Sequence, residues 1–140
     1  MHFNADEARK TIMNHYMKPT HKHNLTVGNF QTTFSNTCSD KLELELQWDN
    51  DVLVDAKFNG HGCAIFIAST DLFIDLIKGK TKAEIIELST LLKQFVNQEE
   101  ISEADINKLE QMWVFYNVKT HLNRVNCALL TSNTFLKDNE

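Results

Sequence analysis

The sequence has little that would place the chain in a membrane, on a nucleic acid or outside the cell. Its 19 acidic and 14 basic residues give a net charge of −5, and no run of basic residues could follow a phosphate backbone or an anionic membrane surface. No apolar stretch is long enough to cross a bilayer. The first residues, 1–7, lack the regions of a signal peptide. We therefore expect a cytoplasmic protein whose partners are neither nucleic acids nor membranes.

Cysteine is scarce, and its count is odd. The chain holds Cys38, Cys63 and Cys127, which, without a secretion signal, argues against a disulfide framework. Three unrelated buried cysteines are one alternative. Internal repeats, low-complexity segments and linkers are also lacking, and 140 residues can bury a core without a metal, so we expect one domain over residues 1–140. The three sulfurs are then better explained as metal ligands or reactive thiols.

Two strands are predicted by the alternation of apolar and polar residues over 42–48 and 52–58. An Asp-Asn-Asp sequence between them has the composition of a turn, so they should form an antiparallel hairpin. A less regular strand pattern lies within 24–34. Because an antiparallel hairpin brings its two outer ends to the same edge, Cys38 and Cys63 should be neighbours in space.

Helical spacing of apolar side chains predicts helices over most of the remaining chain. The first helix is predicted over 5–17, ending before Pro19, and the second over 63–78, ending at Gly79. A Thr81–Glu84 capping box begins the third, and Ser102 with Asp105 begins the fourth. The last is predicted over about 122–136, with Thr120 or Asn123 as N-cap. Residues 81–115 contain no cysteine or histidine, so this helical insertion is expected to serve packing or partner contact. Residues 137–140 are expected to be a disordered tail. The pattern predicts an α+β fold, with a small antiparallel sheet of about three strands and helices packed on one face.

A glycine-flanked cysteine lies where the second predicted strand gives way to a helix. In Gly60-His61-Gly62-Cys63 the glycines allow a sharp turn and a close approach to the sulfur. A cysteine in the first turn of a helix lies near unpaired N–H groups and the positive end of the helix dipole, which favours its thiolate. Cys127 should lie in the early turns of the last helix, so a second helix N-terminus is expected to face the same point.

Three thiolates leave one position of a tetrahedral zinc site open. Asp40 is the favoured fourth ligand because it lies two residues beyond Cys38. His61 and His121 are alternatives, although each is more simply a turn or helix-start histidine. Arg124, about one helical turn before the last cysteine, would offset the negative charge of such a site, or would be a solvated helix residue.

His15, His21 and His23 are also close together in the sequence. The first belongs to the predicted helix and the other two to a polar loop, and no cysteine or regular ligand spacing accompanies them. The sequence therefore does not favour a metal site there.

Several segments resemble the U-type iron–sulfur cluster assembly family, which comprises IscU, the N-terminal domain of NifU, and SufU. The matching segments, in the family's order, are Ile12-Met13-Asn14-His15-Tyr16 followed by Pro19, Cys38-x-Asp40, residues 55–69 with Gly62-Cys63, Ile77-Lys78-Gly79-Lys80, and Arg124-x-x-Cys127-Ala128. The long interval between the last two cysteines resembles the SufU type, and the proline-rich chaperone-docking motif of IscU is absent.

The resemblance implies that the four zinc ligands are Cys38, Asp40, Cys63 and Cys127. It also implies a cysteine desulfurase of the SufS kind as partner, downstream iron–sulfur assembly or acceptor proteins, and Cys127 or Cys38 as the residue that accepts persulfide sulfur. The chain would then act as a zinc-dependent sulfurtransferase. The alternative is a scaffold that holds iron or a [2Fe–2S] cluster at the same ligands, and a third reading is a purely structural zinc.

The chain departs from the family pattern at two places. Ser39 replaces the usual glycine between the first cysteine and the aspartate. If that position required a positive φ, serine would cost about 1 kcal/mol and would re-aim Asp40. Thr131-Ser132-Asn133 stands where the family tends to have a tryptophan, so a partner or packing contact made by that tryptophan would be lost.

Overall fold

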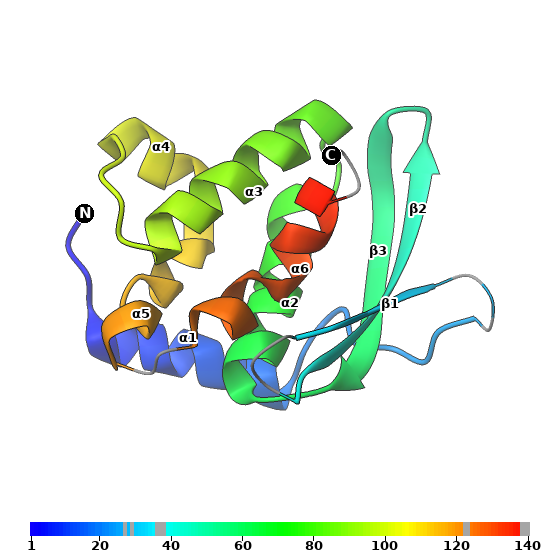
Figure 1. The fold of residues 1–140 in the computed structure, drawn as a ribbon, viewed down its shortest axis with the longest axis horizontal. Helices are drawn as coiled ribbons and strands as arrows, with labels where there is room; N and C mark the ends of the chain where they lie inside the picture. Colours follow the sequence, from blue (N-terminus) through cyan, green and yellow to red (C-terminus); the bar gives the residue numbers. More distant parts are fainter. Residues whose placement is uncertain (27, 29, 36–38, 122–123, 138–140) are drawn as a thin grey trace.

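The protein is described by a computed structural model that covers residues 1–26, 28, 30–35, 39–121 and 124–137 (Figure 1). In chain order the elements are α1 (Ala5–Met17), β1 (Gln31–Phe34), β2 (Lys41–Asp49), β3 (Val52–His61), α2 (Ala64–Ile77), α3 (Lys82–Val96), α4 (Glu103–Lys108), the 3₁₀ helix η1 (Glu110–Phe115), α5 (Val118–His121) and α6 (Val125–Lys137). The sheet lies on one side of the molecule and the helices gather on the other, which confirms the predicted α+β class. Within the described ranges, no helix is long and apolar enough to cross a membrane.

The sheet is antiparallel, with strand order β1-β2-β3. The predicted hairpin is confirmed, since Leu44 pairs with Phe58 and Lys41 pairs with His61 at its open end. Its inner face is apolar and buried, so it packs against the helices. The less regular pattern in 24–34 yields only the short strand β1, which pairs with the outer edge of β2.

The alternation over 52–58 predicts that Val52 and Val54 share the inward face of Phe58, and this prediction is wrong in the first half of β3. The pairing of β2 with β3 shifts between Gln47 and Trp48, so Val54 has no partner in the register. A bulge of this kind moves the residues before it to the opposite face. Leu53 is therefore fully buried, whereas Val54 is 42% exposed.

The central element is α2, which packs against α1, α6 and β3. It is buried on nearly all sides, as expected of a helix that is apolar all round. Cys63 is its N-cap and Lys78 its C-cap, so the helix is one residue shorter at each end than the sequence pattern predicts. Gly79 follows with φ +88°, the left-handed conformation that ends helices.

The later helices follow their capping signals, but two predictions of continuous helix are wrong. Thr81 and Glu84 form the predicted capping box of α3, and the Ser102 side chain accepts the Asp105 N–H at the start of α4. The apolar spacing from Ile106 to Trp113 predicts that this helix continues, but α4 ends at Lys108 and η1 follows it. The buried residues of η1 are Met112, Val114 and Phe115, and its N-cap Leu109 is buried as well. Leu109, Met112 and Phe115 are spaced by three, which suits the three-residue turn of a 3₁₀ helix.

The last helix begins later than predicted. Thr120 lies inside the separate short helix α5, and α6 begins at Val125 after Arg124, whose carbonyl accepts the Ala128 N–H. The other predicted N-cap, Asn123, lies outside the described residues. Lys137, expected in the tail, is the last residue of α6, and residues 138–140 lie outside the described ranges.

Candidate metal centre

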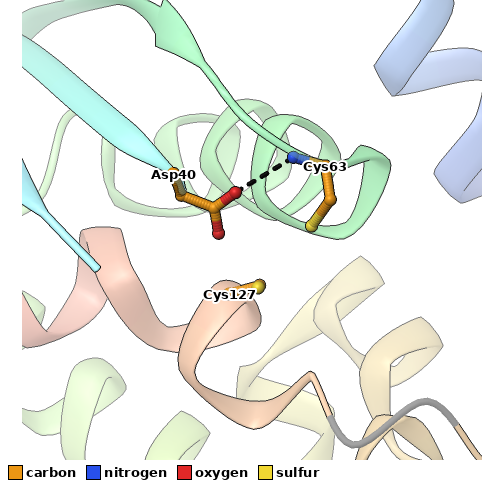
Figure 2. A group of neighbouring side chains, drawn as sticks. All are labelled: Asp40, Cys63 and Cys127. Atoms are coloured by element: carbon orange, nitrogen blue, oxygen red, sulfur yellow. Dashed lines mark hydrogen bonds between the residues drawn. The ribbon is translucent and has the colours of Figure 1, made fainter. Parts of the chain in front are cut away.

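Three of the expected ligands come together where the hairpin meets two helix starts. Asp40 immediately precedes β2, Cys63 is the N-cap of α2, and Cys127 is the third residue of α6 (Figure 2). One ligand atom from each residue lies within 4.8 Å of the other two. Neighbouring ligand atoms at this spacing are within reach of one metal ion after small side-chain rotations.

The hairpin register places Asp40 beside the start of α2. Because Lys41 pairs with His61, the residue before the first strand lies next to the residues after the second. The Cys63 N–H donates a hydrogen bond of 3.0 Å to Asp40 Oδ1. This N–H belongs to the unpaired donors of a helix start, so Asp40 caps a helix that lies far from it in the sequence. The Cys63 side chain makes no cap hydrogen bond.

The second carboxylate oxygen of Asp40 supports a metal at this position. Asp40 is 2% exposed, and within the part of the chain that the structure describes its Oδ2 is buried with no hydrogen-bond partner. A buried polar atom without a partner costs about 1–3 kcal/mol, and more when the group is charged. One carboxylate oxygen and two thiolates are donors that zinc takes. The residues present therefore fit a zinc ion, and the thiolates fit iron equally.

Gly62 makes room for the carboxylate. A Cβ at this position would lie 2.3 Å from Asp40 Oδ1 and 2.6 Å from Cδ2 of Phe66, distances that real Cβ atoms do not show. Sequence reasoning expected the glycine to allow a close approach to the sulfur, whereas the structure shows that the close neighbour is Asp40. Two sequence features could have indicated that Asp40 is the neighbour: the glycine directly before Cys63 and the register of the hairpin.

The other expected site residues differ in their positions. Cys38 lies outside the described residues, two positions before Asp40. With serine at position 39, the Asp40 carboxylate still lies against the two described cysteines. His61 is exposed at the end of β3 and is not part of the three-residue group. His121 is the last residue of α5, and its side chain lies outside the described part of the structure.

An apolar cleft leads to the centre from one side. It has a volume of about 450 Å³ and lies between α1 and the start of α2. Ile12 and Met13 line one wall and Cys63 lies on the other. Arg124 and Arg9 also line the cleft, and the Arg9 guanidinium lies 3.3 Å from the Asp6 carboxylate. Cys63 is half-buried, whereas Cys127 is fully buried beneath it. A partner entering this cleft would therefore meet Cys63 first, and sequence patterns alone did not indicate the cleft.

The family is decided by comparison with known proteins. Residues 7–128 match the NifU-like N terminal domain. The chain belongs to this family. It is 30% identical to the zinc-dependent sulfurtransferase SufU of Bacillus subtilis over 135 residues, covering 94% of this chain and 90% of the relative. It is 28% identical to the iron–sulfur cluster assembly scaffold protein IscU of Streptococcus pyogenes, covering 87% and 76%.

Solved structures agree with this assignment. A crystal structure from Fervidobacterium islandicum, described as an iron–sulfur cluster assembly scaffold protein for the SUF system, is 32% identical, covers 91% of this chain and 93% of its own, and has a TM-score of 0.81. An N-terminal NifU-like protein from Brucella abortus shares the fold, with a TM-score of 0.75 and 17% identity over 94% of each chain. The predicted family resemblance and the predicted fold class are thereby confirmed.

Proposed function

We propose that this member of the NifU-like N terminal domain family acts in iron–sulfur cluster biogenesis as a zinc-bound acceptor of persulfide sulfur from a cysteine desulfurase. The observation that carries the proposal is the meeting of Asp40, Cys63 and Cys127, in which one carboxylate oxygen and two sulfurs lie within 4.8 Å of one another. Among the described residues, Asp40 Oδ2 is buried with no hydrogen-bond partner. A relative that matches almost the whole chain is named a zinc-dependent sulfurtransferase, which supports the same chemistry here.

The proposed ligands are Asp40, Cys63, Cys127 and, from the resemblance, Cys38. Bound zinc would hold the sulfurs as thiolates and shield them from other oxidants and electrophiles. The two oxygens of the Asp40 carboxylate have different proposed roles. Oδ1 accepts the Cys63 N–H at the start of α2, and Oδ2 is the proposed metal ligand. Arg124, at the N-terminal end of α6, is proposed to offset the negative charge of this ligand set.

Sulfur transfer is a thiol–disulfide type of exchange. The thiolate of Cys127 or Cys38 attacks the terminal sulfur of the desulfurase persulfide. A new S–S bond forms on the accepting cysteine, the S–S bond of the donor breaks, and the donor cysteine leaves as a thiolate. The apolar cleft beside Cys63 gives the persulfide-bearing segment a route that excludes water, with Arg9 and Arg124 near an anionic persulfide.

A second candidate is a scaffold for a [2Fe–2S] cluster at the same ligands. The names of the Streptococcus and Fervidobacterium relatives favour this reading. Cysteine thiolates hold such clusters, so the donor set alone does not separate the two candidates.

The test is the metal content and absorption spectrum of protein purified without oxygen, together with the rate of a cysteine desulfurase with and without the chain. The sulfur-acceptor proposal expects a colourless protein with about one zinc at the cysteine centre, lost in Cys63→Ser and Asp40→Ala, and a faster desulfurase. Asp55→Asn is the matched control, because it removes a carboxylate from β3 outside the centre. A brown protein with iron and sulfide in equal amounts supports the scaffold, and unchanged metal content in Cys63→Ser refutes both.

A further inference from the structure

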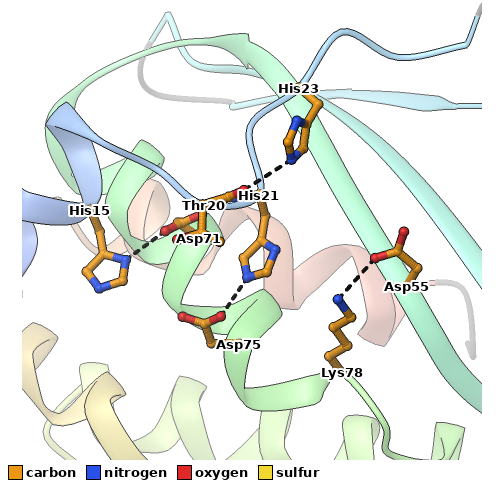
Figure 3. Close-up of polar contacts among 8 residues, drawn as sticks. All are labelled: His15, Thr20, His21, His23, Asp55, Asp71, Asp75 and Lys78. Atoms are coloured by element: carbon orange, nitrogen blue, oxygen red, sulfur yellow. Dashed lines mark hydrogen bonds and ion pairs between the residues drawn. The ribbon is translucent and has the colours of Figure 1, made fainter.

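A second group of metal-binding side chains lies on α2, away from the cysteine centre. We call it the His–Asp cluster, and it comprises His15, His21, Asp71 and Asp75 (Figure 3). The two aspartates lie one helical turn apart on α2, and the histidines come from α1 and from the segment that follows it. Asp71 is eight residues beyond Cys63, which corresponds to about 12 Å along a helix, so the two groups do not share ligands.

Asp71 is the buried centre of the cluster. Its side chain is 0% exposed, its Oδ1 accepts the backbone N–H of His21 at 2.7 Å, and its Oδ2 lies 2.7 Å from Nδ1 of His15. Asp75 is 50% exposed, and its Oδ1 lies 2.6 Å from Nε2 of His21. The cluster thus has a buried end at Asp71 and an open end at Asp75, which gives an ion a path from solvent.

The donor atoms have the type and spacing of a metal site. One ring nitrogen of His15 and one carboxylate oxygen from each of Asp71 and Asp75 lie within 4.8 Å of one another. In a tetrahedral site with bonds of about 2.0–2.1 Å the ligand atoms are roughly 3.3 Å apart, so small side-chain rotations suffice. One imidazole nitrogen and two carboxylate oxygens suit zinc and neighbouring divalent transition metals.

The charge of the His–Asp cluster also favours a bound cation. Two carboxylates face two imidazoles, so with neutral histidines the cluster carries a charge of −2 that a divalent cation would balance. The nearest basic side chain drawn with the cluster, Lys78, is paired with Asp55 at 3.3 Å. His23 bonds to the carbonyl of Thr20 and not to an aspartate of the cluster.

We propose that the His–Asp cluster binds a divalent transition metal ion such as Zn²⁺, with His15, Asp71 and Asp75 as its protein ligands. His15 binds through the lone pair of Nδ1, with its proton on Nε2, and the ion takes the place of the hydrogen bond now made to Asp71. His21 orients the Asp75 carboxylate from the outer shell, as partners of ligating carboxylates commonly do. Water completes the coordination at the exposed side of Asp75.

Binding would fasten α1 to α2 beside the cleft. His15 follows Ile12 and Met13 on α1, and both of these line the cleft next to Cys63. An ion held between His15 and the two aspartates therefore fixes the position of the cleft wall relative to the cysteine centre. The cluster is in this way a candidate regulator of access to that centre, although its metal binding does not depend on the proposed sulfur chemistry.

The test is a zinc titration of the full chain, with zinc bound per chain measured by competition with a chromophoric chelator. The variants are His15→Gln and Asp75→Asn, which change partly exposed residues, and the control is His23→Gln, an exposed histidine outside the cluster. The parent and the control are expected to bind one more zinc than either variant. In the variants the zinc affinity of the His–Asp cluster is expected to fall by about 100-fold or more. Circular dichroism establishes that each variant is folded.

Equal zinc stoichiometry and affinity in the parent and both variants would overturn the proposal, as would loss of the additional zinc in the control. Cys63→Ser separates this result from the proposed function, because it removes a ligand of the cysteine centre and leaves the cluster intact. If the cysteine centre binds no zinc, every count falls by one, and the difference between the parent and Asp75→Asn still decides the proposal.

Discussion

Gly62→Ala tests the packing on which the metal centre depends. The new methyl group would lie 2.3 Å from Asp40 Oδ1 and 2.6 Å from the ring of Phe66. Phe66 is fully buried and has no room to withdraw, so the carboxylate has to move. Forced repacking costs about 1–3 kcal/mol, and losing the charged hydrogen bond from the Cys63 N–H costs about 1.5–3 kcal/mol. Together these contributions predict a loss of about 2.5–6 kcal/mol in the free energy of unfolding.

Gly79→Ala is the matched control. Gly79 has φ +88° and nothing within 4 Å of an added Cβ, so alanine there meets backbone strain without a clash. Its expected cost is about 1–2 kcal/mol, the strain of a side chain in the left-handed conformation. Urea unfolding of both variants in a chelator gives the metal-free stabilities, and zinc affinity is then measured separately. Gly62→Ala should lose both stability and zinc affinity, whereas Gly79→Ala should keep its zinc affinity. A Gly62→Ala protein as stable as Gly79→Ala, with unchanged zinc affinity, would refute the close approach of the carboxylate.

Three further predictions follow from burial, exposure and capping. Because the bulge turns Leu53 inward and Val54 outward, Leu53→Ala should lower the free energy of unfolding by about 2–5 kcal/mol and Val54→Ala by less than about 1 kcal/mol, measured by urea unfolding; similar losses would contradict the bulge. In metal-free folded protein, iodoacetamide should alkylate the half-buried Cys63 well before the buried Cys127, as peptide mass spectrometry would show; the reverse order would be inconsistent with the site. Hydrogen bonds from the backbone N–H and the hydroxyl of Thr81 lower the pKa of Glu84 below its ordinary value of 4.5. The ionised carboxylate therefore stabilises the fold above pH 4.5, and this contribution is lost as the pH falls through the lowered pKa. The stability difference between the parent and Glu84→Gln should therefore shrink between pH 7 and pH 3, and a pH-independent difference would argue against this capping box.

The parts of the fold that local patterns determine were predictable from the sequence. Strict alternation identified the hairpin, and the Thr81–Glu84 capping box identified the start of α3. The bulge at Val54 was not predictable, because its residue sequence continues the alternation and only the packing of Leu53 decides the face. Similarly, no glycine or proline in the sequence marks the start of α6 at Val125.

The candidate site divides in the same way. Hairpin geometry predicted that Cys38 and Cys63 are neighbours, but Cys38 lies outside the described residues. The structure shows the neighbour of Cys63 to be Asp40, two positions after Cys38, which accepts the Cys63 N–H. The His–Asp cluster was missed because Asp71 and Asp75 lie within an apolar helical pattern and show no relation in sequence to the histidines of the first helix. Only the packing of α1 on α2 brings them together.

The residues of the cysteine centre also constrain the order in which folding and metal binding at this candidate site would occur. Asp40 and Cys127 are far apart along the chain, and they meet only after the hairpin has formed and α6 has docked against α2. Closing so long a loop is entropically costly in an unfolded chain, so the ligands cannot gather round an ion before the fold does. Metal loading at this candidate site would thus be a late event that reports a completed tertiary structure, and the binding free energy would be added to the stability of the folded state alone.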